Sequence, residues 1–331
     1  MAATRTWRPV HSVDGPYRAR LDQIGDLNQV FSDAFTERYR RDGMVGVRVP
    51  YLNPAVWRYA IEDADAGAML WRDDRGHIAA FNMVHRSGTE GWMGPLAVRT
   101  EYQATGLGKE IVSRGVEWLK QTGATVLGLE TMPRTMDNIG FYSRLGFVPG
   151  RLTLTTTLDA ALAERPASLL ARRSAEEKES VLAECRALLA GIAPGYDYTR
   201  EIALTDELSL GDTVLLREEG GGQSGGGRLV GFALAHTVPL VEGRAREELR
   251  VLKLVLDRED RFGALARALC DFARRSGTRR VALRVQGEYQ ATYQRLIGMG
   301  ARVRWTDLRM SLVEYEERRP DGAIVLSNWE I

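Results

Sequence analysis

The sequence predicts a mixed α/β protein made of two similar units in tandem. The chain has 331 residues, which is long for one domain and suits two. Strand-like and helix-like patterns alternate along both halves. The order of these patterns returns in the second half, where Tyr293-Gln294-Arg295-Leu296 repeats the Tyr-x-Arg-Leu spacing of Tyr142-Ser143-Arg144-Leu145. We therefore expect two copies of one architecture.

The first half opens with helices and a hairpin. After a polar leader we expect a strand at 17–21, and apolar residues at helical spacing predict a helix over 24–39. Asn53-Pro54 begins a second, short helix, because proline suits the first helical position. Strands at 68–72 and 77–85 flank an Asp-Asp-Arg-Gly turn, which predicts a hairpin.

A glycine-containing turn then separates a strand from a long helix. The strand is expected at 91–98, with Gly94-Pro95 as a bulge because proline donates no ladder hydrogen bond. The turn Gln103-Ala104-Thr105-Gly106-Leu107-Gly108 follows, and the helix runs to Gln121. A strand at 125–131, a short helix ending near Leu145 and a strand at 147–157 complete this half.

The second half repeats this order after a helical stretch. Residues 159–190 are rich in Ala, Glu and Arg and are expected to be helical. The glycine-rich segment 218–228 is expected to be a solvated loop. The remaining expected elements are strands at 213–217, 229–237, 249–256 and 280–285 and a helix at 261–276.

Composition excludes several classes of function. The 45 Lys+Arg nearly balance the 44 Asp+Glu, whereas nucleic-acid or membrane binding by charge needs clustered cations. Cys185 and Cys270 suggest no disulfide framework and no metal site. No apolar run is long enough for a membrane span, and the N-terminus lacks a signal-peptide pattern. We expect a soluble, cytoplasmic protein that binds no nucleic acid, membrane or metal.

The glycine turn carries the functional prediction. Glycines let the backbone approach a phosphate closely, and the helix N-terminus behind them favours an anion. Asn138-Ile139-Gly140-Phe141-Tyr142-Ser143-Arg144-Leu145-Gly146-Phe147 follows about thirty residues later. Together the two segments resemble the acyl-CoA-binding core of the GNAT superfamily of N-acyltransferases.

The resemblance implies two GNAT-like domains in tandem, each a mixed, largely antiparallel twisted sheet flanked by helices. We expect a leader at 1–14, a GNAT domain at 15–157, a helical linker at 158–176, a degenerate second domain at 177–315 and a tail at 316–331. The second copy has Asp257-Arg258-Glu259-Asp260 where the first has its glycine turn. Carboxylates there would repel a pyrophosphate. One acyl-CoA site, in the first domain, is therefore expected.

The resemblance also implies which residues hold acetyl-CoA, the expected co-substrate. The backbones of Leu96, Ala97 and Val98 would bond the pantetheine amides, and Asn138 and Phe141 would lie beside them. As an alternative, Asn138 could simply cap its helix. The residues expected around the pyrophosphate are Gln103, Ala104, Thr105, Gly106, Leu107, Gly108 and Lys109.

Tyr142 is the expected general acid, because the resemblance places this tyrosine beside the thioester sulfur. Many GNAT members carry a glutamate base on the central strand, but Trp92 and Met93 stand there in this chain. Glu130 on the neighbouring strand, acting through a water, is the expected base. Glu90 and His85 are alternatives. For Tyr142 a purely structural role stays open, and so does a salt bridge or a helix cap for Glu130.

The expected function is transfer of an acetyl group from acetyl-CoA to a primary amine of a small molecule, amino acid or peptide. Glu90, Trp92 and Trp57 are expected near the acceptor, since aromatic walls suit cationic groups. Two alternatives stay open, a non-catalytic acyl-CoA or metabolite sensor and an aminoacyl-tRNA-dependent transferase. The chain is expected to be a monomer or a homodimer.

Overall fold

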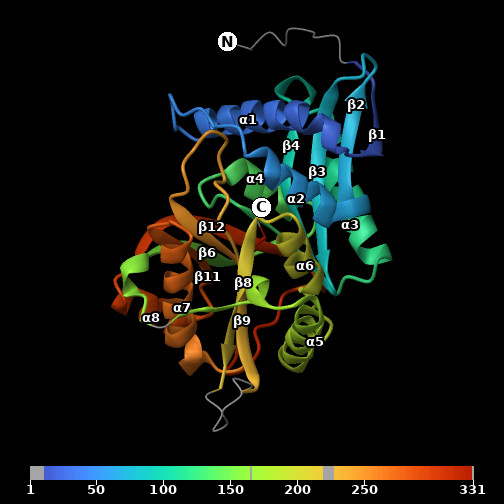
Figure 1. The fold of residues 1–331 in the computed structure, drawn as a ribbon. Coiled ribbons are helices and arrows are strands. Elements are labelled where there is room, and N and C mark those ends of the chain that lie inside the picture. Colours follow the sequence, from blue (N-terminus) through green and yellow to red (C-terminus); the bar gives the residue numbers. More distant parts are fainter. Residues whose placement is uncertain (1–10, 165, 219–226, 330–331) are drawn as a thin grey trace.

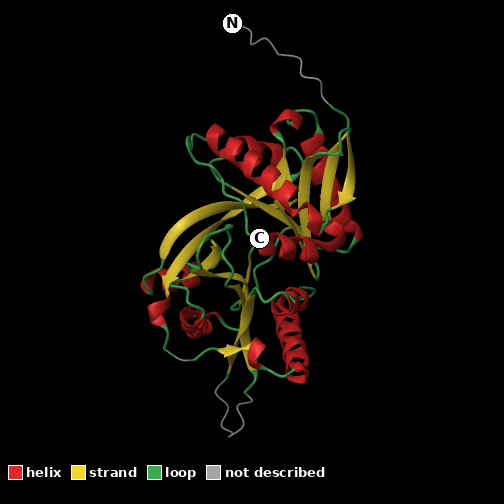
Figure 2. Ribbon diagram, turned by 45° about the horizontal axis from the view of Figure 1, so that its top comes forward, coloured by secondary structure: helices red, strands yellow, loops and turns green. Residues whose placement is uncertain are grey.

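One continuous sheet runs through the whole molecule. The computed structural model describes residues 11–164, 166–218 and 227–329. In this part of the chain thirteen strands join in the order β1-β2-β3-β4-β5-β12-β6-β11-β10-β9-β8-β7, and β13 pairs with β10. Figures 1 and 2 show the first half at one end of this curved sheet and the second half at the other.

The first unit comprises the elements from β1 to α4. Helices α1 and α2 cover one face of its strands, and α3 packs behind β3 and β4 (Figure 1). Its elements are β1 (Val13–Arg18), α1 (Ile24–Arg41), α2 (Pro54–Ala64), β2 (Ala68–Asp73), β3 (Ile78–Ser87), β4 (Glu90–Val98), α3 (Leu107–Gln121), β5 (Val126–Thr131) and α4 (Met136–Ser143).

The second unit, from β7 to α8, repeats this sequence of elements. Its elements are β7 (Ser168–Leu169), α5 (Ala175–Ile192), α6 (Thr199–Glu207), β8 (Gly211–Arg217), β9 (Leu229–His236), β10 (Glu248–Leu256), α7 (Phe262–Arg275), β11 (Arg280–Gln286) and α8 (Gln290–Gly298). The predicted repeat is therefore present, and β3, β4, α3, β5 and α4 correspond to β9, β10, α7, β11 and α8.

The two units exchange their last long strands. Strand β6 (Phe147–Asp159) leaves the first unit and pairs with β11, and β12 (Arg302–Leu312) leaves the second unit and pairs with β5. The two strands also pair with each other along their length. This exchange makes each unit depend on the other for its sheet.

A third strand segment fills a gap in the second unit. Strands β10 and β11 pair in parallel only over Glu248–Arg250 and Arg280–Ala282, and then diverge. Strand β13 (Ile324–Ser327) enters the gap and pairs with Lys253–Leu256 of β10. In the first unit β4 and β5 likewise pair only over Glu90–Met93 and Val126–Leu129. There, no strand of the described residues fills the gap.

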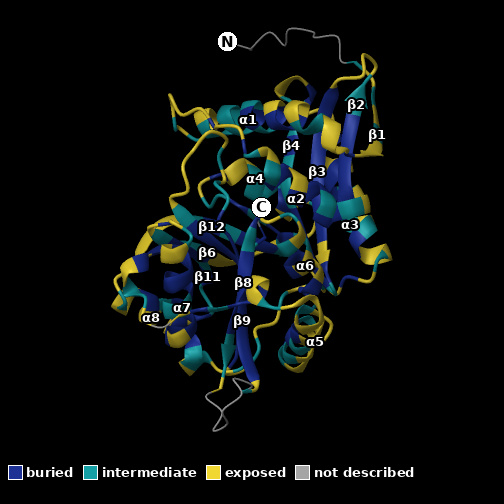
Figure 3. Ribbon diagram, viewed as in Figure 1, coloured by how far each residue is buried: buried dark blue, intermediate teal, exposed yellow. Residues whose placement is uncertain are grey.

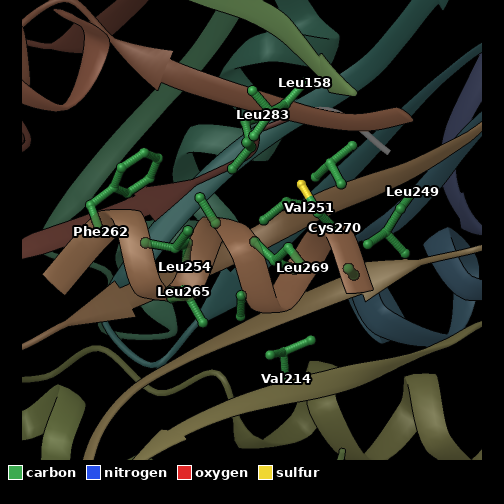
Figure 4. Close-up of a cluster of buried hydrophobic side chains, with 14 of the residues drawn as sticks. Leu158, Val214, Leu249, Val251, Leu254, Phe262, Leu265, Leu269, Cys270 and Leu283 are labelled. Atoms are coloured by element: carbon green, nitrogen blue, oxygen red, sulfur yellow. The ribbon is translucent and has the colours of Figure 1, made fainter. Parts of the chain in front are cut away.

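Amphipathic helices close the core on both sides of the sheet. In the second unit α7 places Phe262, Leu265 and Leu269 against β10 and β11, as Figure 4 shows. Burying each such side chain stabilises the fold by about 1.5–3 kcal/mol. The strands are mostly buried and the outer helix faces are exposed (Figure 3).

The structure differs from the expected elements mainly between the units and in the tail. The helix expected over 159–190 starts only at Ala175, where Ser174 forms a capping box with Glu177. The preceding residues extend β6 and form β7. Most of the glycine-rich segment, 219–226, lies outside the described residues, as do residues 1–10 of the leader. None of the described helices is long and apolar enough to cross a membrane.

Candidate functional site

The glycine turn lies where β4 passes into α3. Gly106 is the N-cap of α3 with φ of 97°, and Ala104 has φ of 63°. A side chain at either conformation costs about 1 kcal/mol or more, so glycine suits position 106. A Cβ at Gly106 would meet no atom within 4 Å. The turn therefore presents open backbone at a helix N-terminus, which suits an anion.

Side chains of the turn hold its shape. Gln103 Nε2 donates to Val98 O at 3.1 Å, and Gln103 Oε1 accepts from Arg41 Nη1 at 2.9 Å. Thr105 Oγ1 donates to Tyr102 O at 2.7 Å. Leu107 is buried in the core beneath the turn. Gln103, Thr105 and Leu107 thus shape the turn, and its backbone is left to face a ligand.

A cavity of about 320 Å³ connects this turn with the unpaired edge of β4. Beyond Met93, the edge of β4 that faces β5 has no strand partner among the described residues. Most of the residues expected to hold acetyl-CoA line the cavity together with Ala34, Phe35 and Arg38. Those residues are Leu96, Ala97, Val98, Gln103, Ala104, Gly106, Gly108, Lys109, Asn138, Phe141 and Tyr142. The sequence-predicted residues are thus brought together, except for Thr105 and Leu107.

Helix α4 forms the opposite wall. Its N-cap is Thr135, so Asn138 lies inside the helix rather than capping it. A Cβ added at Gly108 would lie 3.5 Å from the Phe141 ring. Glycine at position 108 leaves room between α3 and α4 at the cavity.

A second cavity, of about 350 Å³, adjoins the first. Leu96, Asn138 and Tyr142 line both. Its other walls come from both units: Phe31, Tyr39, Met93 and Leu129 from the first, and Leu240, Val241, Trp305, Asp307 and Trp329 from the second. We call it the acceptor cavity. Local sequence patterns do not show which residues after 240 reach this place, because the loop after β9, the exchanged strand β12 and the returning tail bring them there from distant parts of the chain.

Tyr142 is placed at the junction of the two cavities. Burial raises the pKa of its phenol to about 12. Within the described residues no hydrogen bond engages the Tyr142 hydroxyl. The phenol therefore stays protonated at neutral pH and can donate a hydrogen bond into the junction.

Glu130 is engaged by two arginines from the second unit. Its side chain is 1% exposed and accepts hydrogen bonds from Arg284 Nη2 at 2.5 Å and Arg309 Nε at 3.0 Å. Burial alone would raise the pKa of Glu130, but the two guanidinium charges outweigh burial and lower the pKa to about 2. The surface that Glu130 gives to the acceptor cavity is therefore main chain. This geometry does not favour Glu130 as the general base.

Glu90, Trp92 and Trp57 lie in the core rather than at the acceptor cavity. Glu90 accepts hydrogen bonds from Trp329 Nε1 at 2.8 Å and Tyr198 Oη at 3.0 Å. Trp92 stacks on His85 with ring centroids 4.0 Å apart, and Trp57 Nε1 donates to Asn28 Oδ1 at 2.8 Å. These three residues lie on the strand and the helix where the sequence predicted them. The sequence did not show that their side chains would face the core.

His85 is likewise buried. Its Nδ1 lies 2.6 Å from Asp63 Oδ2, and its side chain has no exposed surface. His85 is absent from the linings of both cavities described above, so it is in no position to act as a base there.

Comparison with known proteins agrees with this geometry. Residues 27–147 match the model of the Acetyltransferase (GNAT) family. This match covers most of the first unit, including the glycine turn, the open edge of β4 and all of α4. No curated protein matches the chain.

Solved structures share the fold over nearly the whole chain. A GCN5-related N-acetyltransferase from Sphaerobacter thermophilus is 14% identical with a TM-score of 0.56, covering 98% of this chain and 100% of that one. A tandem GNAT protein from the clavulanic acid biosynthesis pathway is 12% identical, with a TM-score of 0.58 and coverage of 93% and 100%. N-myristoyltransferase of Saccharomyces cerevisiae is 10% identical, with a TM-score of 0.60 and coverage of 96% and 82%. At these identities the likeness shows the fold: the chain has a GNAT fold, and its repeated units match a tandem GNAT protein.

Proposed function

We propose that this protein transfers an acetyl group from acetyl-CoA to a primary amine, directly in a ternary complex. One observation carries the proposal: the cavity at the glycine turn and the acceptor cavity share a wall that contains Tyr142. A donor in the first cavity and an amine in the second would meet beside that hydroxyl. The family match supports acyl transfer as the type of reaction.

Each part of acetyl-CoA has a matching feature in the first cavity. The backbone from Ala104 to Lys109 would take the pyrophosphate, with the N-terminus of α3 supplying unpaired N–H groups. The free edge of β4 at Leu96–Val98 would pair with the pantetheine amides, with Asn138 and Phe141 on the other side. A β4 backbone N–H would stabilise the oxyanion of the thioester carbonyl.

The reaction forms a C–N bond and breaks the C–S bond. The amine nitrogen attacks the thioester carbon, and the tetrahedral intermediate expels the thiolate. Tyr142 donates its hydrogen bond to the departing sulfur, and the proton lost by the amine goes to water. Such assistance contributes on the order of 10²-fold to the rate.

The second unit would not bind acyl-CoA. Strand β13 pairs with β10 in the gap that corresponds to the open edge of β4. The carboxylates in the acidic turn of the second unit already form ion pairs, among them Asp257–Arg228 at 3.0 Å and Glu259–Arg319 at 3.1 Å. We propose that this unit supplies walls of the acceptor cavity instead.

One observation favours a sensor as the second candidate. The carboxylates at the acceptor cavity, Glu130 and Asp307, are both paired with Arg284. A panel of amines with acetyl-CoA, followed by release of free thiol, separates the two functions. Turnover with an amine and its loss in the Gly106→Asp variant support the transferase. Calorimetric binding of acetyl-CoA without thiol release from any amine would identify a sensor. Longer acyl-CoA donors in the same assay define the acyl chain.

A further inference from the structure

Strand β12 has an open edge beside the acceptor cavity. It pairs with β6 from Arg302 to Leu312, but with β5 only over Leu308–Ser311. From Arg302 to Asp307, the edge facing the first unit has no strand beside it among the described residues. Val303 and Trp305 on this stretch are 43% and 39% exposed. Unpaired N–H and C=O groups on such an edge are a template for another extended chain.

The space beside this edge is a wedge that leads to the acceptor cavity. Strand β5 ends at Thr131, and residues 132–134 diverge from β12. A cavity of about 330 Å³ lies between them and Val303–Thr306. Met132 and Trp305 line both this wedge and the acceptor cavity, so the two spaces adjoin.

The direction of β5 determines how a peptide would lie in the wedge. Thr131 is the last residue of β5 and pairs with Leu308, antiparallel to β12. A peptide that continues the line of β5 has its N-terminus beside Thr131 and Asp307, at the acceptor cavity. Its chain then runs towards Arg302. A peptide in the opposite direction would present its carboxylate to the cavity, which offers no chemistry for an acyl acceptor.

We propose that the acceptor is the N-terminal α-amine of a peptide that pairs, in extended form, with β12 between Arg302 and Thr306. This inference rests on the proposed acetyl transfer and specifies its substrate class. An α-amine has a pKa of about 8, so roughly one in ten is neutral at pH 7, against about one in 2,500 for a lysine side chain. An acceptor of this kind needs little help from a base, which fits the ion-paired state of Glu130 and Asp307.

Charges along the wedge favour acidic residues beyond the first few of the peptide. Arg134, Arg302 and Arg304 are exposed, and within the described residues no ion pair joins them to a carboxylate. Arg134 donates to a main-chain oxygen, that of Asp42, and Arg304 Nε donates to Thr157 Oγ1 at 3.1 Å. Three cations beside an open strand edge would therefore attract carboxylates of the docked chain.

The experiment compares acceptors of different length and charge with the full chain and acetyl-CoA. The probes are alaninamide, which fills only the acceptor cavity, Ala-Ala-Ala-Glu-Glu-Glu amide, and Ala-Ala-Ala-Lys-Lys-Lys amide. We expect the acidic peptide to have the highest kcat/KM, about tenfold or more above alaninamide, and mass spectrometry to place the acetyl group on its N-terminus. Equal kcat/KM for the acidic peptide and alaninamide, or modification of lysine side chains in preference to the α-amine, overturns the proposal. Acetylation of another amine of the panel, with none of the three probes acetylated, overturns the peptide acceptor and leaves the transferase function standing. Acetyl-CoA binding without thiol release from any amine overturns the transferase function itself.

Charge reversal tests the location of the peptide. In Arg304→Glu we expect KM for the acidic peptide to rise about fivefold, as the loss of an exposed ion pair predicts, with kcat unchanged. Arg279→Glu, at an exposed position of the second unit, is the matched control and should leave KM unchanged. Unchanged KM in Arg304→Glu contradicts docking along β12. Arg302→Glu gives the same test at a second position if Arg304→Glu is unstable.

Discussion

The indole of Trp329 lies directly over Gly128 of β5, where a Cβ would be 2.1 Å from the ring carbon Cζ3. Trp329 Nε1 donates to Glu90 Oε1 at 2.8 Å, and the Arg309 guanidinium lies 3.8 Å from the ring centroid. Strand β13, two residues earlier, is fixed in the gap of the second unit. The tail of the second unit thus provides a wall of the acceptor cavity in the first.

Gly128→Ala tests the packing of the Trp329 indole on Gly128. The new methyl group overlaps the indole and also lies 2.9 Å from Met310 O, so we expect a loss of about 2 kcal/mol of stability in urea unfolding, as overpacking typically costs. Because Trp329 lines the acceptor cavity, KM for the amine should rise while acetyl-CoA affinity stays unchanged.

A double-mutant cycle identifies the cause. In a Trp329→Ala background, the loss of stability caused by Gly128→Ala should fall to half or less of its value in the wild type, because the ring is gone. Gly191→Ala is the control, because a Cβ there meets nothing within 4 Å. Additive effects of the two substitutions would show that the indole and Gly128 are not coupled.

Glu130→Gln tests whether the carboxylate holds the units together. Removing one partner of a buried ion pair costs about 3 kcal/mol, and here the arginines left behind belong to the second unit. The folded pKa of about 2 lies below the unfolded value of about 4.3. The ion pairs therefore stabilise fully above pH ~4.3 and lose their contribution as the pH falls towards 2.

Urea unfolding at pH 7 and pH 3 measures this effect. The difference in stability between wild type and Glu130→Gln should be larger at pH 7. If Glu130 were instead the base, the variant would keep its stability at pH 7 and lose the ascending limb of its pH–rate profile.

Tyr142→Phe removes only the hydroxyl at the junction of the cavities. We expect kcat to fall by about 10² with acetyl-CoA affinity little changed, because the hydrogen bond forms to the leaving sulfur in the transition state. Thiol-release assays measure kcat, and calorimetry measures the affinity for acetyl-CoA. Near-normal kcat on a good acceptor would show that Tyr142 has only a structural role.

The pH–rate profile gives an independent test of the same hydroxyl. Because burial raises the pKa of Tyr142 to about 12, the phenol keeps its proton across the assay range. The rate should rise as the acceptor amine loses its proton and should not fall again below pH ~10. A descending limb near pH 9 that disappears in Tyr142→Phe would show that the phenol titrates much earlier.

The sequence predicts the local features of the site well and the long-range ones poorly. The turn before α3 can be predicted because its backbone has positive φ at Gly106, a conformation that favours glycine and is visible in the local sequence. The inward orientation of Trp57 and Trp92 depends on packing across the sheet, which alternation along one strand does not reveal. Arg284 approaches Glu130 because β6 and β12 are exchanged, and Trp329 approaches Gly128 because the tail returns beyond β13. In each pair the two residues are more than 150 positions apart. Nothing in the local pattern of β6 or β12 predicts that exchange.

Calorimetric titration with acetyl-CoA tests the central claim most directly. The account predicts one site per chain in the wild type and no binding in Gly106→Asp, where a carboxylate enters the proposed phosphate site. Gly76→Asp is the matched control, because Gly76 also has positive φ and open space within 4 Å but lies in the β2–β3 turn. It should bind acetyl-CoA as the wild type does. Two sites per chain, or unchanged affinity in Gly106→Asp, would contradict a single acetyl-CoA site at the glycine turn of the first unit.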